Sequence, residues 1–450
     1  RSSSWPRTER ALLRIYISTR TLRASRRWPG MLDARFIREN EAVVRQSLKD
    51  RGQDESVLDE FVELDGRWRT LTEEGNALRR HRNEVSEQVP KLPKDEKQAK
   101  IAEMKAISDR IKAIEADVKK IEGARDELLL NIPNTPDPSV PVGALDEGDV
   151  FLRTWGAKRE FDFKPLPHWE IGERLDILDF DRGVKVTGTG FYVLKGDGAR
   201  LERALINFML DLHHDQGYRE VFPPAVINRK SCVGTGQLPK MQDDMYWIER
   251  DDLWLNPTAE VPVTNLYADE IFEKKQLPVY HTAYLPSFRR EPGKHIETKG
   301  IARVHQFNKV ELVKFVLPET SQQELETLLA DAEAVTQALR LPYRIRLLCT
   351  GSIGFHSSKT YDIEAFAPGM DQWLEVSSCS DFKEFQARRA MIKFRREPHL
   401  KSEFVHTLNG SGIALPRTMV SVLENYQNKD GTVTVPEVLR PYMKGTEVIG

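Results

Sequence analysis

The sequence has few cysteines and lacks the motifs of the common nucleotide-binding folds. Its three cysteines, Cys232, Cys349 and Cys379, lie far apart, without a CxxC pair or a Cys/His cluster. Neither a disulfide framework nor a zinc site is therefore indicated, and a reducing compartment is favoured. No GxGxxG opens a helix and no GxxxxGK[ST] is present, so Rossmann and P-loop nucleotide binding are unsupported. No apolar run approaches the length of a transmembrane helix, and we expect no membrane partner.

An excess of charge of either sign is also absent. The 450 residues are 40% hydrophobic and 30% charged, and the formal net charge is −2. This composition is typical of a globular protein with a sizeable core, and the length predicts about two or three domains. Without net positive charge, the chain can bind nucleic acid only through a local basic patch.

Residues 1–30 differ from the rest of the chain, because they are rich in arginine and serine and contain one acid, Glu9. Such a composition resembles a mitochondrial transit peptide. The alternative, which we favour, is a disordered or extraneous stretch upstream of the working protein, because Met31 opens a well-patterned segment. We therefore expect a cytoplasmic protein, or a mitochondrial-matrix protein if residues 1–30 are a transit peptide.

Two heptad patterns follow, on either side of a break at Pro90–Pro93. In the first, positions 57, 61, 64, 68, 71, 78, 85 and 89 are apolar, with Gly75 and Arg82 at two seam positions. The second runs through Met104, Ile107, Ile111, Ile114, Val118 and Ile121. This spacing predicts two helices of about 35 residues joined by a tight turn, an antiparallel coiled coil about 50 Å long.

The tip of this hairpin is basic. Seven basic residues stand against four acids: Arg79, Arg80, Arg82, Lys91, Lys94, Lys97 and Lys100 against Glu84, Glu87, Asp95 and Glu96. A basic tip on a projecting rod can grip a phosphate backbone. The alternative, which charge alone favours, is a solvated face or a protein-docking arm.

Residues 131–149 are proline-rich and predict a linker. Beyond it, helical patterns at 198–216 and 320–340 alternate with strand patterns at 190–195, 301–316, 343–349 and 372–378. Because several strands are neighbours in sequence, we expect an α+β domain, an antiparallel sheet flanked by helices.

The segments Leu285–Glu291 and Arg303–Phe307 are the most informative part of this domain. On two strands, Arg289 and Glu291 would share one face, and Arg303, His305 and Phe307 another. A guanidinium can clamp a phosphate, a carboxylate can accept from an amino group, and a ring can stack on a base. These residues predict a nucleotide site, and the alternative is a two-faced hairpin with a charged outer face.

A series of motifs resembles the seryl-tRNA synthetase family of class II aminoacyl-tRNA synthetases, from Met31 to Ile449. The motifs are Gly234–Lys240, Thr258-Ala-Glu260, Arg303–Leu312, Cys349-Thr-Gly351, Gln386–Arg389, His406–Gly412 and Leu423–Gln427. The resemblance implies a tRNA-binding domain at 31–130 with the coiled-coil arm, the linker at 131–149, and a class II catalytic domain at 150–450. It also implies a homodimer, with Gly217–Pro224 as the class II motif 1 that packs at the dimer interface.

The resemblance implies an ATP site built from three segments. In Phe288–Phe307, Arg289 would bind the α-phosphate as a catalytic residue, Glu291 would meet the adenine amino group, and Phe307 would stack on adenine. In Gly410–Arg417, Arg417 would be catalytic and hold the terminal phosphates. The implied ATP-binding set is Arg289, Arg290, Glu291, Val304, Phe307, Glu375, Val376, Ser377, Ser378 and Arg417.

Each of these assignments has a structural alternative. Arg290 is equally explained as a solvent-exposed neighbour, and Arg417 as a helix-end arginine in a surface ion pair. The resemblance makes Glu375 and Ser378 the Mg²⁺ ligands, but their strand parity is opposite. Both can reach one ion only near a strand end or a bulge. The alternative there is a pair of strand-end serines that satisfy backbone groups.

For the amino acid, the resemblance implies a set of small and acidic residues: Thr258, Ala259, Glu260, Arg289, Glu311, Asn409 and Ser411. Glu311 shares parity with Val313 and Phe315, which predicts a buried face. A buried acid needs a partner, either a substrate ammonium group or an internal cation such as Lys309.

The implied reaction is the ATP-dependent attachment of L-serine to serine tRNA through a seryl-adenylate, with Mg²⁺ as the metal and no zinc. Selenocysteine tRNA is an implied second acceptor. The arm would contact the elbow and long variable arm of serine tRNA, and one tRNA would lie across both subunits. The implied tRNA contacts are Arg79, Arg80, Arg82, Lys91 and Lys94.

The sequence departs from the family pattern at few positions. The loop between Glu291 and Arg303 is a residue shorter than in many relatives, Asp381-Phe382 replaces a frequent Asn-Cys, and Pro416 replaces a frequent Gly. Two rival functions remain. A ligase that loads a carrier protein would lack the arm, and a non-catalytic paralogue would have lost residues such as Arg289 or Arg417.

Overall fold

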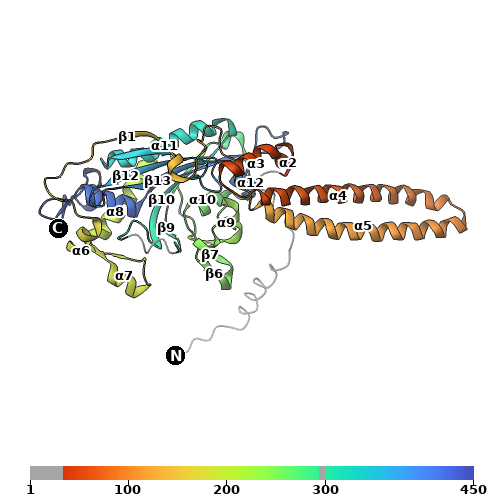
Figure 1. The fold of residues 1–450 in the computed structure, drawn as a ribbon, viewed down its shortest axis with the longest axis horizontal. Coiled ribbons are helices and arrows are strands. Elements are labelled where there is room, and N and C mark those ends of the chain that lie inside the picture. The colour runs from red at the N-terminus through yellow and green to blue at the C-terminus, as the bar shows by residue number, and fades with distance from the viewer. Residues whose placement is uncertain (1–33, 293–298) are drawn as a thin grey trace, which may run out of the picture.

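The structure is a computed structural model that describes residues 34–292 and 299–450, apart from the side chains of Lys91, Lys94 and Asp95. It consists of a helical N-terminal part and a larger part in which helices pack on a sheet (Figure 1). The extension predicted at residues 1–30, with Met31, lies outside the described residues.

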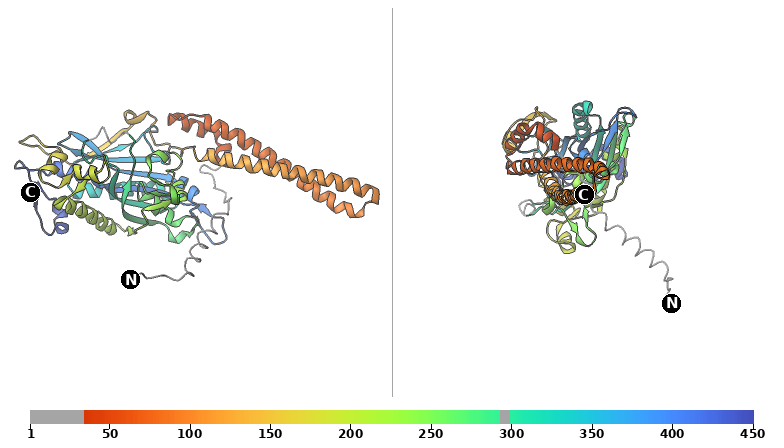
Figure 2. Two further views of the ribbon diagram at one scale, coloured as in Figure 1. Left: turned by 90° about the horizontal axis from the view of Figure 1, so that it is seen from below. Right: turned by 90° about the vertical axis from the view of Figure 1, so that its right-hand side faces the viewer.

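The helical part ends in a long hairpin. Short helices α2 (Ala34–Glu39) and α3 (Glu41–Asp50) precede α4 (Ser56–Gln88) and α5 (Lys94–Leu129), which have 33 and 36 residues. A 3₁₀ turn at Val89–Lys91 joins the long helices. α4 and α5 lie side by side and project away from the rest of the molecule (Figure 1 and the left view of Figure 2). The predicted antiparallel coiled coil is confirmed.

The seam of the hairpin follows the heptads with one shift. Val85, Ile111, Ile114 and Ile121 are buried, and a Cβ at Gly75 would lie 3.3 Å from Ile114 Cγ2, so the glycine allows close helix approach. At the base of the hairpin, the buried residue is Leu58 and not the predicted Val57, because α4 there packs on α2 and α3 as well as on α5. The buried residues of this small core are Ile37, Val44, Leu48, Leu58, Phe61, Leu129 and Ile132.

The larger part is built on an eight-stranded sheet with the strand order β1-β11-β12-β13-β16-β10-β9-β4. All neighbours pair antiparallel except β4 and β9. The predicted α+β fold with an antiparallel sheet is confirmed. The strands are β1 (Val150–Trp155), β4 (Arg219–Glu220), β9 (Val279–Phe288), β10 (Gln306–Val316), β11 (Tyr343–Leu347), β12 (Lys359–Ala367), β13 (Gln372–Lys383) and β16 (His406–Ala414).

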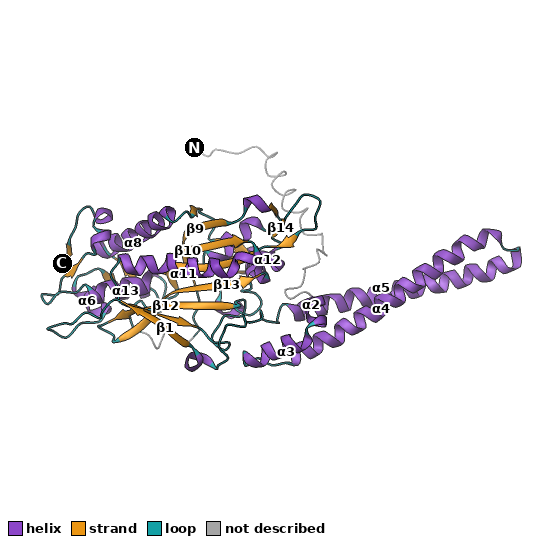
Figure 3. Ribbon diagram, turned by 90° about the horizontal axis from the view of Figure 1, so that it is seen from above, coloured by secondary structure: helices purple, strands orange, loops and turns teal. Residues whose placement is uncertain are grey.

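The alternation of side chains along β10 separates two cores. Val310 and Leu312 belong to the main core, which includes residues of α8 (Gly196–Asp215), α11 (Ser321–Ala338) and α13 (Leu415–Asn425). Figure 3 shows these helices lying over the strands. Val313 and Phe315 pack in a second core with residues of α10 (Glu260–Thr264) and α12 (Phe385–Ala390). Lys309 and Glu311 share the parity of this second face.

Shorter elements surround the sheet. The helices are α6 (His168–Arg174), α7 (Phe180–Val186) and α9 (Arg229–Thr235). Two small sheets have two strands each: β2 (Leu178–Asp179) with β3 (Val193–Leu194), and β17 (Val433–Thr434) with β18 (Val448–Ile449). Two have three strands each: β5 (Val226–Asn228), β7 (Leu253–Leu255) and β6 (Trp247–Ile248), and β15 (Glu403–Phe404), β14 (Lys393–Arg395) and β8 (Ile271–Glu273). Within residues 34–292 and 299–450, no helix is both long and apolar enough to span a bilayer.

Candidate active site

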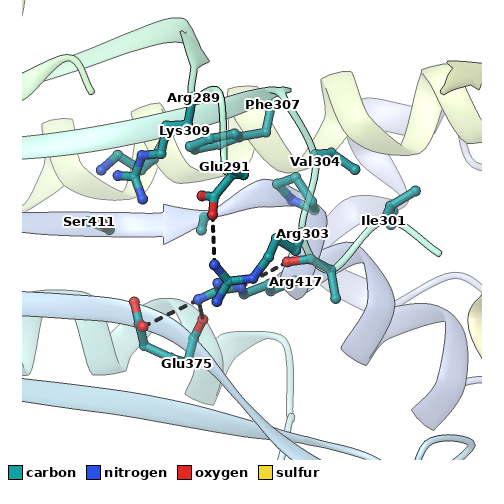
Figure 4. A pocket seen from close by; sticks show the side chains of 13 residues that line it. Arg289, Glu291, Ile301, Arg303, Val304, Phe307, Lys309, Glu375, Ser411 and Arg417 are labelled. Carbon is teal, nitrogen blue, oxygen red and sulfur yellow. Dashed lines mark hydrogen bonds and ion pairs between the residues drawn. The ribbon is translucent and has the colours of Figure 1, made fainter. Parts of the chain in front are cut away.

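Two adjoining pockets open on the second face of the sheet. The first is lined by Arg289, Glu291, Arg303, Val304, Phe307 and Arg417 among others (Figure 4). The second is lined by Thr258, Glu260, Asp362, Ser378 and Asn409 among others. Arg289, Lys309, Glu375 and Ser411 line both pockets, which makes them one continuous site.

Arg289 and Glu291 do not lie on a strand, contrary to the prediction. β9 ends at Phe288, and Glu291 has a φ of +41°, a left-handed conformation that turns the chain out of the extended path. The backbone N–H of Arg289 still donates to His305 O at 2.9 Å, just before β10 begins at Gln306. The nucleotide candidates are therefore held at the mouth of a hairpin and not along it.

The charged groups of the first pocket pair with one another. Arg303 Nη1 lies 2.7 Å from Glu291 Oε2, and the Arg289 guanidinium carbon lies 5.3 Å from the centre of the Phe307 ring. Arg417 Nη1 donates to the Glu375 backbone oxygen at 2.8 Å (Figure 4). The ion-pair alternative for Arg417 is thus present, but its partner Glu375 is itself a pocket residue.

A β-bulge brings Glu375 and Ser378 to one face. Ser378 pairs with Asp362 and Glu375 pairs with Glu364 across β12 and β13, and the register shifts between Ile363 and Glu364. Because Asp362 and Glu364 are two apart on a regular strand, their partners Ser378 and Glu375 share a face despite their opposite parity. The sequence required a strand end or a bulge for Glu375 and Ser378 to reach one metal ion, and the bulge is present.

Glu311 lies behind the wall of the second pocket: it does not line the pocket itself, but its partners Lys309, Thr258 and Asn409 do. Its carboxylate is fully buried and lies 2.6 Å from Lys309 Nζ. Thr258 Oγ1 donates to Glu311 Oε2 at 2.6 Å, and Asn409 Nδ2 donates to Oε1 at 2.9 Å. The buried face predicted from parity is confirmed, and so is the ion pair with Lys309. Hydroxyl, amide and ammonium groups of the pocket wall are therefore arranged around one buried carboxylate.

A second bulge sets this arrangement. Along β10 and β16, Val310 pairs with Ile413 and Glu311 pairs with Ser411, so Gly412 has no partner. The extra residue turns Ser411 toward Glu311, at 3.4 Å from Ser411 Oγ to Oε1. A Cβ at position 412 would lie 2.6 Å from His213 Nε2, and only glycine fits there.

Glu260 is a second buried acid beside the first. Gln386 Nε2 donates to its Oε1 at 2.6 Å. Burial, with the nearby Glu311 carboxylate, raises the pKa of Glu260 to about 7. Burial, with the charge of Arg389, lowers the pKa of His356 to about 3, so the imidazole is neutral at pH 7. Near neutral pH, the site therefore combines an acid that titrates with a histidine that does not.

Some predicted residues do not reach the pockets through their side chains. Ala259 and Val376 are buried in the cores, and Ser377 Oγ donates to Ser411 O at 2.7 Å. Arg290 is exposed, and its Nη1 donates to Asp243 O at 3.1 Å. Ala259, Val376 and Ser377 can therefore take part in binding only through the backbone or by holding their neighbours, and Arg290 lines neither pocket.

The basic residues of the arm differ in their surroundings. Arg79 Nη2 lies 2.8 Å from Glu115 on the other helix, whereas Arg80 is exposed. The side chains of the predicted tRNA contacts Lys91 and Lys94 lie outside the described residues. Arg80 and Arg82 have no ion-pair partner within the described part of the arm, and they are the better candidates for an external anion.

Asp362 and Lys309 are two of the pocket residues that the predicted site lacked. Asp362 Oδ1 is buried without a hydrogen-bond partner among the described residues, next to Ser378. Burial, with the adjacent Glu375 carboxylate, raises the pKa of Asp362 well above its usual value. The sequence does contain a sign of Asp362, because apolar and polar residues alternate along Lys359–Ala367, a segment in which no strand was predicted. Lys309 was considered only as a partner of Glu311, but it lines both pockets.

Comparison with known proteins identifies the family. Residues 31–136 match the seryl-tRNA synthetase N-terminal domain, and residues 246–426 match the tRNA synthetase class II core domain (G, H, P, S and T). A serine–tRNA ligase of Carboxydothermus hydrogenoformans is 54% identical over 92% of this chain and 98% of its own length. The chain belongs to the seryl-tRNA synthetase family.

Other members of the seryl-tRNA synthetase family agree with this. The serine–tRNA ligase of Thermomicrobium roseum is 52% identical over 93% of this chain and 95% of its own length. The crystal structure of the Pyrococcus horikoshii seryl-tRNA synthetase complexed with ATP matches with a TM-score of 0.89 at 37% identity, over 93% of this chain and 99% of that one. The enzyme class expected from the sequence, an aminoacyl-tRNA synthetase, is confirmed.

Proposed function

We propose that this chain attaches L-serine to serine tRNA in two steps, with ATP as a substrate. In the first step, a serine carboxylate oxygen attacks the α-phosphorus of ATP, and the bond to pyrophosphate breaks. In the second, the terminal adenosine hydroxyl of the tRNA attacks the carbonyl carbon of seryl-adenylate, and AMP leaves. The first step requires alignment and charge neutralisation and no protein nucleophile.

The buried Glu311 carboxylate is the observation that carries the proposal. It is fully buried behind the second pocket, and its partners Lys309, Thr258 and Asn409 line that pocket, which is continuous with the first. An ammonium group and a small hydroxyl can join such a cluster without leaving polar atoms unpaired. Alanine brings the ammonium group but no hydroxyl to this cluster, and a site that pairs a substrate hydroxyl penalises such an analogue strongly.

The first pocket suits ATP. Phe307 offers a ring for a base, and the guanidinium groups of Arg289 and Arg417 face the same space. Arginine binds phosphate in a two-pronged geometry and keeps its charge at any working pH. Arg289 lines both pockets, so it is placed to neutralise charge where the serine carboxylate would meet the α-phosphate.

The residues around the β13 bulge fit Mg²⁺. Glu375 and Ser378 share a face, and Asp362 adds a carboxylate oxygen that has no hydrogen-bond partner within the described chain. Mg²⁺ prefers oxygen ligands, retains waters, and is commonly held by one or two carboxylates with substrate phosphates. When bound, the ion supplies positive charge to the phosphates. Glu375 and Ser378 would hold it, and Asp362 would lie beside it.

The arm is proposed to bind serine tRNA. Its length and its exposed Arg80 suit recognition of tRNA shape and backbone, which requires little base contact. Selenocysteine tRNA is proposed as a second acceptor from the family resemblance alone. The proposed compartment is the cytoplasm, with the mitochondrial matrix as the alternative if residues 1–30 act as a transit peptide.

We also propose a homodimer, with one tRNA across both subunits. Within the described residues β4, in the segment that resembles motif 1, is an edge strand of the main sheet, and the nearby Phe222 side chain is 77% exposed. An exposed edge strand beside a large apolar side chain suits a subunit interface. Phe222→Glu should halve the mass measured by light scattering, whereas a monomeric parent protein would contradict the proposal.

The decisive experiment is charging of total tRNA with serine, threonine and alanine, beside ATP–pyrophosphate exchange with each. Serine-only charging supports the whole proposal. Serine-dependent exchange without charging would confine the proposal to adenylate formation and direct attention to another acceptor. Absence of both activities would refute it in favour of a non-catalytic tRNA-binding protein.

A further inference from the structure

His168, at the start of α6, is a buried histidine outside both pockets. It has no exposed surface, and both ring nitrogens have partners. Nδ1 lies 2.9 Å from Glu424 Oε1 on α13, and the backbone N–H of Ile301 donates to Nε2 at 3.0 Å. The ring therefore bridges α13 and the segment that leads into β10.

These contacts assign the ring proton. A backbone N–H can only donate, so Nε2 must be the unprotonated acceptor for Ile301. The single proton of a neutral ring then sits on Nδ1 and is donated to Glu424. One tautomer satisfies both partners, and any change that removes the Nε2 lone pair leaves the Ile301 N–H buried and unpaired.

Glu424 is itself held in place from four directions. Oε1 accepts from the backbone N–H and Nδ1 of His168, both at 2.9 Å. Oε2 accepts from the backbone N–H groups of Gly369 at 2.8 Å and Met370 at 3.1 Å. A fully buried carboxylate that accepts this many hydrogen bonds is held in one orientation. The orientation of His168 is consequently fixed by α13.

The same helix holds the next residue of the segment. Arg417, about two turns before Glu424 on α13, donates from Nε to Ala302 O at 3.1 Å. Ile301 and Ala302 are therefore fixed at consecutive residues, one through His168 and one through Arg417. Gly300 precedes them with a φ of +86°, and a Cβ there would overlap the imidazole, so this backbone fits closely around the histidine.

The segment held in this way forms a wall of the first pocket. Ile301, Ala302, Arg303 and Val304 all line it, and Figure 4 shows Ile301 and Val304 at its edge. Arg303 in turn pairs with Glu291 at 2.7 Å. The placement of Glu291, the candidate for the adenine amino group, thus depends on where Ile301 and Ala302 are fixed.

We propose that His168 is a positioning residue for ATP: its Nε2 lone pair fixes Ile301 so that the wall carrying Arg303 keeps the adenine end of the pocket in shape. This inference rests on the proposed use of the first pocket for ATP. It assigns no role in serine binding, because Glu311 and its partners Thr258 and Asn409 come from other elements.

Two matched variants separate the two hydrogen bonds. In His168→Gln, the longer side chain can place its carbonyl oxygen near the Nε2 position and accept from Ile301. In His168→Asn, the amide can replace the Nδ1 donor to Glu424 but is too short to reach Ile301. We would measure ATP affinity by calorimetry without serine, the KM values for ATP and serine in pyrophosphate exchange, and amide hydrogen exchange of residues 299–306.

His168→Asn is expected to weaken ATP binding by about tenfold, because a buried N–H loses its acceptor. It should also accelerate exchange of the Ile301 amide and change the KM for serine by less than about threefold. His168→Gln should retain ATP affinity within about threefold. A purely structural role would lower the melting temperature of both variants without this split, and that result would overturn the inference.

The outcomes also separate this inference from the proposed function. If the unaltered protein shows no serine-dependent exchange but the variants differ in ATP affinity as expected, the proposed function fails and the positioning role stands. If the unaltered protein is active and the two variants bind ATP alike, the positioning role alone fails. Should His168→Asn not fold, a tenfold loss of ATP affinity in His168→Gln would overturn it.

Discussion

Arg417 Nη1 lies 3.3 Å from Glu375 Oε2, so the arginine proposed for the ATP phosphates contacts the carboxylate proposed for Mg²⁺. The pair is partly exposed, and an ion pair of this kind contributes little to stability. ATP with Mg²⁺ offers each side chain a better partner, phosphate oxygens for Arg417 and a divalent cation for Glu375. We infer that the pair keeps both groups at the pocket until the two ligands replace it.

A metal-dependence prediction follows for Glu375→Gln. The amide is a weaker ligand for Mg²⁺ than a carboxylate, so half-maximal pyrophosphate exchange should require about tenfold more Mg²⁺. Glu364→Gln is the matched control, because Glu364 lies opposite Glu375 in the register but is bound by Arg344 and Arg346. Equal Mg²⁺ curves for both variants would contradict the assignment of Glu375.

Thr258 provides a test of serine selection. Thr258→Val keeps the shape of the side chain but removes the hydroxyl that donates to Glu311 at 2.6 Å. We expect the KM for serine to rise by about tenfold or more, and the preference for serine over alanine to fall, with ATP affinity little changed. Thr258→Ser restores the hydroxyl and is the control. An unchanged KM in the valine variant would remove Thr258 from the serine site.

The raised pKa of Glu260 predicts a pH-dependent stability. Because the carboxyl binds its proton more tightly in the folded protein, with a pKa of about 7 against an ordinary 4.5, folding loses stability as pH rises between these values. Glu260→Gln removes this penalty. Its gain in the free energy of unfolding should therefore be larger at pH 8 than at pH 5, by about 2 kcal/mol.

Glu202 gives a matched control for that measurement. Burial raises the pKa of Glu202 to about 7, and it lies on α8 outside both pockets, with Asn308 Nδ2 donating to it at 3.0 Å. Glu202→Gln should show a similar pH-dependent gain in chemical denaturation and leave the KM for serine unchanged, whereas Glu260→Gln should raise that KM. A Glu260→Gln protein with the same pH profile as the parent would refute the pKa argument.

The arm predicts a separation of the two reaction steps. Gly75 and Ile114 touch across the hairpin, so residues 77–112 can be replaced by a short turn that rejoins two neighbouring positions. This truncation should spare serine-dependent pyrophosphate exchange and cripple tRNA charging. A deletion of 70–105 would instead join positions that are out of register. Equal loss of pyrophosphate exchange and of tRNA charging would contradict the proposed binding of tRNA by the arm.

Single charges at the tip refine this test. Arg80→Ala with Arg82→Ala should raise the KM for tRNA by about tenfold and weaken the salt dependence of charging, because phosphate contacts release counterions. Arg79→Ala should have a smaller effect, since Arg79 is already paired with Glu115 at 2.8 Å. Pyrophosphate exchange by all of these variants should equal that of the parent, and a larger effect of Arg79→Ala would reverse the assignment.

Much of the fold followed from periodicity. The heptads fixed the hairpin because apolar side chains spaced by three and four can be buried only along one seam. Parity placed Glu311 on a buried face together with Val313 and Phe315, and the structure confirmed it. Strand β16 and most small sheets were not assigned, and β16 pairs with β10, which lies far from it in sequence. Strand β12 was also missed, although it pairs with its sequence neighbour β13 and its residues alternate.

The geometry of the candidate site depends on backbone features that local sequence patterns do not predict. The resemblance located Glu375, Ser378, Glu311 and Ser411 along the chain, but their meeting depends on two bulges, at Val376 and Gly412, that shift the strand register. A bulge has no strong local signal, because it is a compromise between neighbouring strands. The same holds for the left-handed turn at Glu291, which moves Arg289 and Glu291 off the strand that alternation predicted.

By itself, the sequence determined the coiled-coil arm, the α+β class, the family and the chemical types of the site residues, because composition, spacing and short motifs are local properties. Only the tertiary structure decided which of these residues meet. It paired Arg417 with Glu375, set Asp362 beside Ser378, and joined His168 to Ile301 and Glu424. Each of these contacts joins separate elements of the fold, so each depends on strand order and helix packing, which no local pattern encodes.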